Sequence, residues 1–148
     1  MKKYIIYIIL IVILLVSVFF VGIKISKKQE VDGVVEYAGK GKWWDVVYIF
    51  DKERYEDKHV NYFKITYKKK GEIVKLKDID ITITSKGSII TGNVGDMDVK
   101  ERINEEGFQE ILFLVGTVNR KTYFQDKYKI NIKSSSKSDT VNLTYQKQ

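Results

Sequence analysis

The sequence contains no cysteine and no proline among its 148 residues, and His59 is its single histidine. Without cysteine the chain can form neither disulfides nor thiolate metal sites, and it has no cysteine nucleophile or cysteine to carry a lipid. One histidine cannot make an ordinary zinc site unless carboxylates gather around it from elsewhere. Without proline, nothing marks any segment as a rigid stalk.

Motifs for catalysis and nucleotide binding are also missing. No serine stands in a Gly-x-Ser-x-Gly elbow, and His59 lies in "YEDKHVNYF", where we expect a solvated turn residue. Gly92 and Gly95 are followed neither by Gly-Lys-Ser/Thr nor by an expected helix, so they do not form a phosphate loop. We therefore predict that the protein is not an enzyme and has no cofactor, and we keep a hydrolase as an alternative.

One acidic segment has the oxygen ligands that a cation could use. Asp96, Asp98 and Glu101 follow a glycine-rich turn in "GNVGDMDVKE", and oxygen-rich loops can bind calcium. The EF-hand pattern is not met, because Lys100 occupies the next odd position of the loop. We expect an acidic hairpin loop without a metal, and these three residues are the metal candidates that the sequence offers.

A long apolar run, Tyr4–Ile23, carries no charged residue. About 20 residues at roughly 1.5 Å per residue span a bilayer core of about 30 Å. A secretory signal peptide has a shorter apolar core of about 7–15 residues and a small-residue cleavage site. Ser17 does not form such a site, because the large residue Leu15 stands two positions before it. Gly22 does not form such a site either. We predict a retained transmembrane signal anchor in the lipid bilayer, and a cleaved signal is the alternative.

The positive charge lies mainly beside this run. The whole chain carries +7, but the five lysines within the first 28 residues leave only +2 for residues 29–148. The folded part therefore lacks the basic surplus of a nucleic-acid-binding domain, and we expect no nucleic-acid partner. Positive charges are nearly equal on both sides of the run, so the positive-inside rule is close to a tie. The three-residue tail favours an inside N-terminus, which predicts a single-pass cell-membrane protein with tail 1–3, anchor 4–23, linker 24–32 and an extracytoplasmic domain 33–148.

The remainder of the chain has the period of β-strands. Strict alternation of apolar and polar residues over five to seven positions indicates half-buried antiparallel strands, and Phe108–Val115 is apolar enough to be buried on both faces. No stretch after the linker keeps a 3.6-residue period for ten residues. We predict an all-β fold, an immunoglobulin-like antiparallel β-sandwich of about seven to eight strands preceded by one N-terminal transmembrane helix. The eight runs are Val34–Tyr37, Trp43–Phe50, Tyr62–Lys68, Ile79–Thr84, Ser88–Val94, Phe108–Val115, Tyr128–Lys133 and Val141–Tyr145.

The two tryptophans of the chain are neighbours, and strand alternation assigns them to opposite faces. Trp44 shares its face with apolar residues, so we expect it in the core. Trp43 shares its face with Asp45, so we expect it to be partly exposed and available as a surface contact. A second candidate contact is the run Lys68, Lys69 and Lys70 at an expected hairpin tip. Such lysines can dock on anionic headgroups or wall polyanions, or they can be a solvated turn that blocks edge pairing.

The motif Tyr37-x-Gly39-x-Gly41-x-Trp-Trp, downstream of an anchor and followed by "KLKDIDITI", resembles a known group. These are small, uncharacterised, lipoprotein-like envelope β-domain proteins of Bacillus-type Gram-positive bacteria. The likeness covers about Val35–Tyr145, with Trp43 or Trp44 as the matching tryptophan. Here a transmembrane segment replaces the lipid-bearing cysteine. The resemblance implies an extracytoplasmic β domain of unknown activity and no catalytic residue.

Together these features predict a membrane-anchored extracytoplasmic module that is a protein-binding or accessory component of the cell envelope. The absence of a histidine cluster, a cysteine and a recognisable nucleophile favours this class over an enzyme. The alternative is a surface protein that binds a small molecule or a metal ion.

Overall fold

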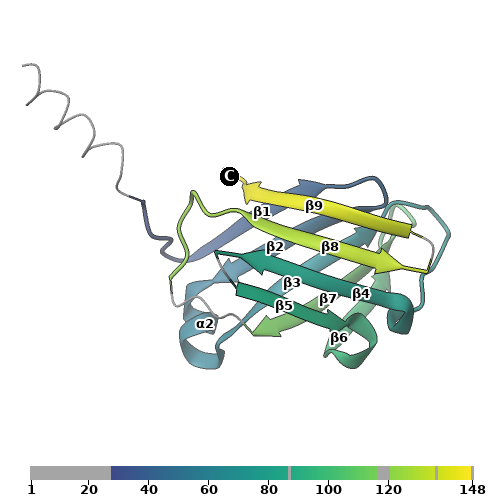
Figure 1. The fold of residues 1–148 in the computed structure, drawn as a ribbon, viewed down its shortest axis with the longest axis horizontal. Helices are drawn as coiled ribbons and strands as arrows, with labels where there is room; N and C mark the ends of the chain where they lie inside the picture. The colour runs from purple at the N-terminus through teal and green to yellow at the C-terminus, as the bar shows by residue number, and fades with distance from the viewer. Residues whose placement is uncertain (1–27, 87, 117–120, 136, 148) are drawn as a thin grey trace, which may run out of the picture.

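The computed structural model describes residues 28–147 except 87, 117–120 and 136. Within these residues, nine strands form one antiparallel sheet in the order β5-β4-β8-β9-β1-β2-β3-β7-β6 (Figure 1). A short helix, α2 (Lys52–Lys58), joins β2 to β3, and two 3-10 turns, η1 (Leu76–Asp78) and η2 (Val94–Asp96), flank the β4–β5 hairpin. The strands are β1 (Val34–Lys40), β2 (Trp44–Asp51), β3 (Val60–Tyr67), β4 (Ile79–Ser85), β5 (Ser88–Asn93), β6 (Val99–Ile103), β7 (Gln109–Gly116), β8 (Tyr128–Ser134) and β9 (Lys137–Tyr145).

The sheet curls over on itself at β9. This strand pairs with β8 from Lys137 to Leu143, but it pairs with β1 only at Thr144 and Tyr145. In Figure 1, β9, β8, β4 and β5 lie in front of β1, β2, β3, β7 and β6. The apolar faces of the two halves therefore face each other and enclose one core.

Two glycines allow the end of β1 to approach β9 closely. A Cβ atom on Gly39 would collide with the backbone carbonyl oxygen of Asn142 and with Val141. A Cβ atom on Gly41 would collide with the carboxylate of Asp139. The Gly-x-Gly spacing before the tryptophans thus reflects the crossing of two strands where the sheet bends.

Aromatic rings fill the centre of this core. The ring of Tyr128 lies 4.9 Å from that of Tyr37 and 4.6 Å from that of Tyr48, both edge-on. The hydroxyl of Tyr37 donates to the carbonyl oxygen of Tyr123 at 2.7 Å. Burial, reinforced by the neighbouring phenols, raises the pKa of Tyr37 and Tyr48 far above the usual range, and burial raises the pKa of Tyr128 to about 12.

The all-β prediction is confirmed, and the predicted strand count is too low. Eight of the nine strands correspond to predicted runs, whereas β6 falls where we expected an acidic loop and α2 was not expected. The immunoglobulin-like sandwich is not confirmed, because the strands form one continuous curled sheet. The expectation for Phe108–Val115 is also wrong in part. One face of β7 is buried, whereas Leu112 and Leu114 on the other face are half-exposed.

The domain packs against the chain that precedes β1. Glu30 forms an isolated bridge with Tyr123, and the backbone N–H of Val31 donates to the carbonyl of Thr122 at 2.8 Å. The side chain of Val31 is buried in the core. None of the described residues belongs to a helix that is long and apolar enough to cross a membrane, and the predicted anchor Tyr4–Ile23 lies outside them.

Candidate contact site around Trp43

A carboxylate from β9 fixes the turn that carries both tryptophans. Asp139 accepts hydrogen bonds from the backbone N–H groups of Lys42, Trp43 and Trp44 at 3.1, 2.7 and 3.0 Å. The backbone N–H of Gly41 donates to the carbonyl of Trp44 at 2.8 Å and closes the turn. Three backbone donors on one carboxylate hold this segment in a single conformation, with successive side chains directed to opposite sides.

The two tryptophans lie as predicted. Trp44 is fully buried, and its ring centroid is 4.8 Å from that of Tyr67. Its indole Nε1 has no hydrogen-bond partner among the described residues. Trp43 is half-buried at the surface and packs against the edge of the core. One ring is therefore a core anchor, and the other is available for contact.

Three lysine ammonium groups converge on the exposed ring. The Nζ atoms of Lys42, Lys137 and Lys69 lie 4.9, 5.1 and 5.6 Å from the ring centroid of Trp43. They come from the turn before β2, the start of β9 and the loop after β3. Cation–π contacts at exposed sites contribute about 0.5–1 kcal/mol each, but like charges gathered around one ring also repel each other. We call Lys42, Trp43, Lys69 and Lys137 the Trp43 cluster.

The positive charge of the cluster is only partly neutralised. Lys137 donates to the hydroxyl of Tyr67, and its Nζ lies 3.5 Å from a carboxylate oxygen of Glu72. The hydrogen bond with Tyr67, followed by attraction to Tyr67 and Glu72, raises the pKa of Lys137. Within the described part of the chain, Lys42 and Lys69 form no ion pair with a carboxylate. Two of the three ammonium groups are therefore free to meet an external anion.

The three lysines of the predicted basic run have different environments. The ammonium of Lys68 donates to the carbonyl of Gly41 at 2.9 Å and lies 3.4 Å from a carboxylate oxygen of Asp45. Its charge is therefore paired within the domain. Lys69 belongs to the Trp43 cluster. Lys70 is exposed and covers the turn before β7. The structure thus brings one residue of the run to Trp43.

A pocket adjoins the cluster on the other side of Lys137. It has a volume of about 280 Å³, and its lining includes Tyr67, Glu72, Asp78, Ser134 and Lys137. This is just below the usual range of ligand pockets, about 300–1,000 Å³. Ser134 is buried, and its hydroxyl oxygen has no hydrogen-bond partner within the described ranges. A hydroxyl, a phenol, an ammonium and two carboxylates therefore surround one small space.

A buried glutamine positions the loop between β3 and β4, which carries Lys69 and Glu72. The side-chain oxygen of Gln109 accepts from the backbone N–H of Val74 at 2.9 Å, and its nitrogen donates to the carbonyl of Val74 at 2.8 Å. The same nitrogen donates to Glu101 at 2.6 Å. We did not single out Gln109 from the sequence. The available signal was an amide on the core face of an otherwise apolar strand.

The structure does not assemble the acidic metal candidates into a metal site. Asp96 lies in η2, whereas Glu101 lies in β6 and accepts from Gln109. Among the residues that the structure describes, no group of three or more His, Cys, Asp or Glu is placed to hold a metal ion. His59 is exposed at the C-terminal cap of α2, with a left-handed φ of 54° and its ring 5.7 Å from that of Tyr55.

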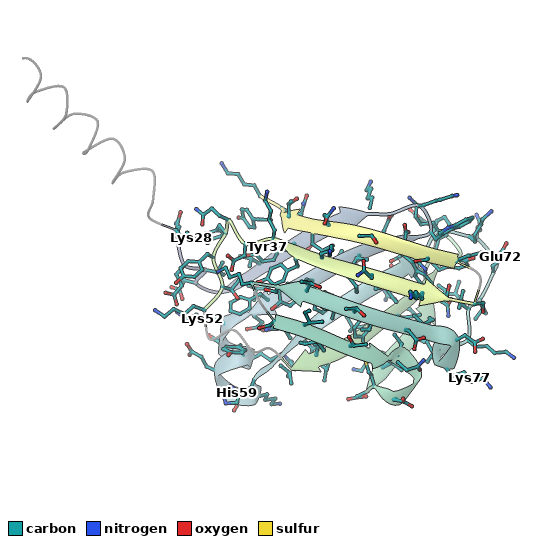
Figure 2. All side chains as sticks on the ribbon, viewed as in Figure 1. Lys28, Tyr37, Lys52, His59, Glu72 and Lys77 are labelled. Atoms are coloured by element: carbon teal, nitrogen blue, oxygen red, sulfur yellow. The ribbon has the colours of Figure 1, made fainter. Side chains whose placement is uncertain are left out.

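The Trp43 cluster lies at the end of the domain opposite to the start of the described chain. Figure 2 shows Lys28, Lys52 and His59 at one end, and Glu72 and Lys77 at the other. Glu72 lies beside Lys137 of the cluster. The exposed tryptophan and its lysines therefore face away from the end at which Lys28 enters.

The structure shows a small all-β domain with a surface cluster of one tryptophan and three lysines at one end. Comparisons with known protein families, with curated proteins and with solved structures found no significant match. The resemblance to envelope proteins of Bacillus-type bacteria stays a prediction.

Proposed function

We propose that this chain is a single-pass protein of the cell envelope that is anchored by Tyr4–Ile23, with its N-terminus inside and its β domain outside. The β domain is an accessory module that binds another component of the envelope, and it does not act as an enzyme. The length of the apolar run and the missing cleavage site support the anchor.

The position of the Trp43 cluster carries this proposal. In a chain anchored before Lys28, the end of the domain near Lys28 faces the membrane and the cluster faces outward (Figure 2). The seven residues of β1 alone span roughly 23 Å at about 3.3 Å per residue. A half-exposed tryptophan at the outer end is well placed for a partner, because tryptophan is enriched among the residues that dominate binding energy at interfaces.

A second candidate function is the binding of a small polar molecule at the same end. The buried hydroxyl of Ser134, without a partner among the described residues, supports this alternative, as does the adjoining pocket of about 280 Å³. A ligand hydroxyl or carboxylate there could satisfy Ser134 and contact Lys137. We favour the binding module over this alternative, because the lysines without an ion pair among the described residues, Lys42 and Lys69, lie on the Trp43 side of Lys137.

The orientation can be tested by protease treatment of intact cells stripped of their wall. We expect the β domain to be cut along with a known surface protein, and a protected domain would overturn the orientation. Recovery of the domain in the medium, with its N-terminus beyond residue 20, would show instead that the apolar run is a cleaved signal.

The contact surface can be tested with a photo-crosslinking amino acid placed in the full chain in cells. The probe replaces Trp43 in one version and Lys129, an exposed residue on β8, in the matched control. We expect one discrete adduct from position 43 and none from position 129. Equal adduct patterns from both positions, or none from either, would contradict a binding surface at Trp43.

A further inference from the structure

The Trp43 cluster gathers more positive charge than the described domain neutralises. Lys42 and Lys69 form no ion pair there, and both ammonium groups lie within 5.6 Å of the same ring centroid as Lys137. Asp139, the nearest carboxylate to the turn, is already held by three backbone N–H groups. Bringing such lysines together costs electrostatic energy that a bound anion would recover.

We propose that the Trp43 cluster is a binding site for an anionic polymer of the envelope, which it holds by phosphate groups between Lys42, Lys69 and Lys137 over the indole ring. This inference rests on the proposed function, because it names the partner of the same surface. Lysine ammonium groups bind phosphate as compact point charges, and no arginine takes part in the cluster.

The arrangement of the lysines favours phosphate over carboxylate. The three ammonium groups reach the ring from three separate chain segments, so their donors approach from different directions. The tetrahedral oxygens of a phosphate group can accept from several directions, whereas a carboxylate offers two oxygens in one plane. A planar, two-pronged anion is matched by arginine, which the cluster lacks.

A polymer fits the site better than a single ion. The cluster lies on an exposed surface, where each charge contact contributes little by itself. A chain of linked phosphates keeps further anions near the site after one is released, which raises the apparent affinity without any new contact. Lys70, the next residue after Lys69, is exposed as well. The anchoring bilayer is a poorer partner, because the cluster faces away from Lys28.

The acidic side chains next to the cluster set the boundary of the site. Glu72 and Asp78 line the pocket beyond Lys137 and would repel a phosphate there. The polymer therefore lies on the Trp43 side of Lys137, where Lys42 and Lys69 form no ion pair with a carboxylate of the described residues. This placement predicts that the indole of Trp43 responds to binding and that the buried indole of Trp44 does not.

The test uses the full chain in phosphatidylcholine nanodiscs, with long-chain inorganic polyphosphate as the probe and calorimetry as the measurement. A double variant, Lys42→Gln with Lys69→Gln, removes two cluster charges. The control, Lys127→Gln with Lys129→Gln, removes two exposed charges elsewhere. Each lysine beside an anionic surface contributes about fivefold in affinity, so the cluster variant should bind roughly 30-fold more weakly. The control should stay within about twofold of the parent.

Salt and competing ligands complete the test. With about three charge contacts, raising the salt from about 50 to about 200 mM should weaken binding roughly 20-fold. Inorganic phosphate alone should bind far more weakly than the polymer. Tryptophan fluorescence should change on binding in the parent but not in Trp43→Phe, in which only the buried Trp44 remains. Lys69→Gln alone, expected to lose about fivefold, repeats the test with a smaller change to the surface.

Besides a failure to bind polyphosphate, three results would overturn the inference: equal losses in the cluster and control variants, tighter binding of polyglutamate than of polyphosphate, or tighter binding of phosphatidylglycerol vesicles than of polyphosphate. The second result indicates an acidic protein partner, and the third indicates a membrane. The crosslinking test of the proposed function is independent of these probes. A discrete adduct from position 43 without polyphosphate binding would refute the proposal of a phosphate polymer as the ligand, and it would still support the proposal that the domain is a binding module.

Discussion

Replacing Trp44 by alanine should remove the largest fully buried side chain of the core. The ring is completely buried and lies 4.8 Å from that of Tyr67. A buried tryptophan removes about 150–250 Å² from water, which at about 25 cal/mol per Å² corresponds to about 4–6 kcal/mol. Measured truncations of this kind cost about 3–5 kcal/mol. Since a domain has only about 5–15 kcal/mol of stability, Trp44→Ala should leave the β domain near unfolding.

Two companion variants separate the contributions to this loss. Trp44→Phe also removes the indole N–H, which lacks a partner among the described residues. Releasing an unsatisfied buried donor recovers about 1–3 kcal/mol, so this variant should lose much less than Trp44→Ala. Trp43→Ala removes a half-exposed ring and should cost about 1 kcal/mol or less, as most surface substitutions do.

The assay is urea unfolding of the full chain in detergent micelles. Circular dichroism follows the sheet, because the fluorescence reporter differs between the variants. We expect stability to fall slightly for Trp43→Ala, moderately for Trp44→Phe and by at least about 3 kcal/mol for Trp44→Ala. A larger loss for Trp43→Ala than for Trp44→Ala would refute the assignment of core and surface faces. Equal small losses would mean that neither ring anchors the core.

Three further predictions concern the crossing of β1 and β9, the loop between β3 and β4, and the buried tyrosines of the core. Gly39→Ala should destabilise the domain by at least about 2 kcal/mol, because the added methyl meets the Asn142 carbonyl; an unchanged melting temperature would contradict this. Gln109→Leu should cost about 1–3 kcal/mol and speed hydrogen exchange at Val74, since it removes both the acceptor for the Val74 N–H and the donor to the Val74 carbonyl; unchanged exchange would contradict the role of Gln109 in holding this loop. Because burial raises the pKa of the core tyrosines, including Tyr128 to about 12, stability should be full below about pH 10 and fall by up to about 1.4 kcal/mol per pH unit per phenol above it; a flat urea midpoint from pH 10 to about pH 12 would contradict this.

Half-buried strands are the part of the fold that the sequence predicts well. In β2 and β3, burial alternates from residue to residue, and large apolar or aromatic side chains occupy the buried positions from Trp44 to Phe50 and from Phe63 to Tyr67. Such strands have one face on a core and one face in water, so each residue type reports its own environment. The same alternation correctly separated Trp44 from Trp43.

The elements that the sequence does not reveal lie where burial is weak. Every residue of β6, "VKERI", is exposed or half-exposed, and β6 is one of the two edge strands of the curled sheet. Its charged residues protect an open sheet edge against pairing with another chain. The same residues leave β6 without the apolar alternation by which a strand is predicted from sequence. Helix α2 has seven residues and one buried side chain, Tyr55, so no helical period can build up. Its local signals are the Asp51 N-cap and His59 at the C-cap.

The candidate site depends on contacts between distant parts of the chain. Trp43 and the neighbouring lysines stand out in the sequence, but Lys137 is more than 90 residues away and has no local signal. Its place beside Trp43 follows from the start of β9, where Asp139 holds the tryptophan turn. The curl of the sheet at β9, which no local pattern encodes, therefore assembles the cluster.

The adjacency of the two tryptophans has a structural consequence for the surface. Trp44 packs on Tyr67 inside the core, and the hydroxyl of Tyr67 accepts from Lys137. The ammonium of Lys137 lies 4.8 Å from the ring centroid of Tyr67 and 5.1 Å from that of Trp43. The Trp43 cluster is thus connected to the core through the phenol of Tyr67 and the ammonium of Lys137. Since Trp43 directly precedes the buried Trp44, its backbone is held in place, which would reduce the ordering cost of a contact at its ring.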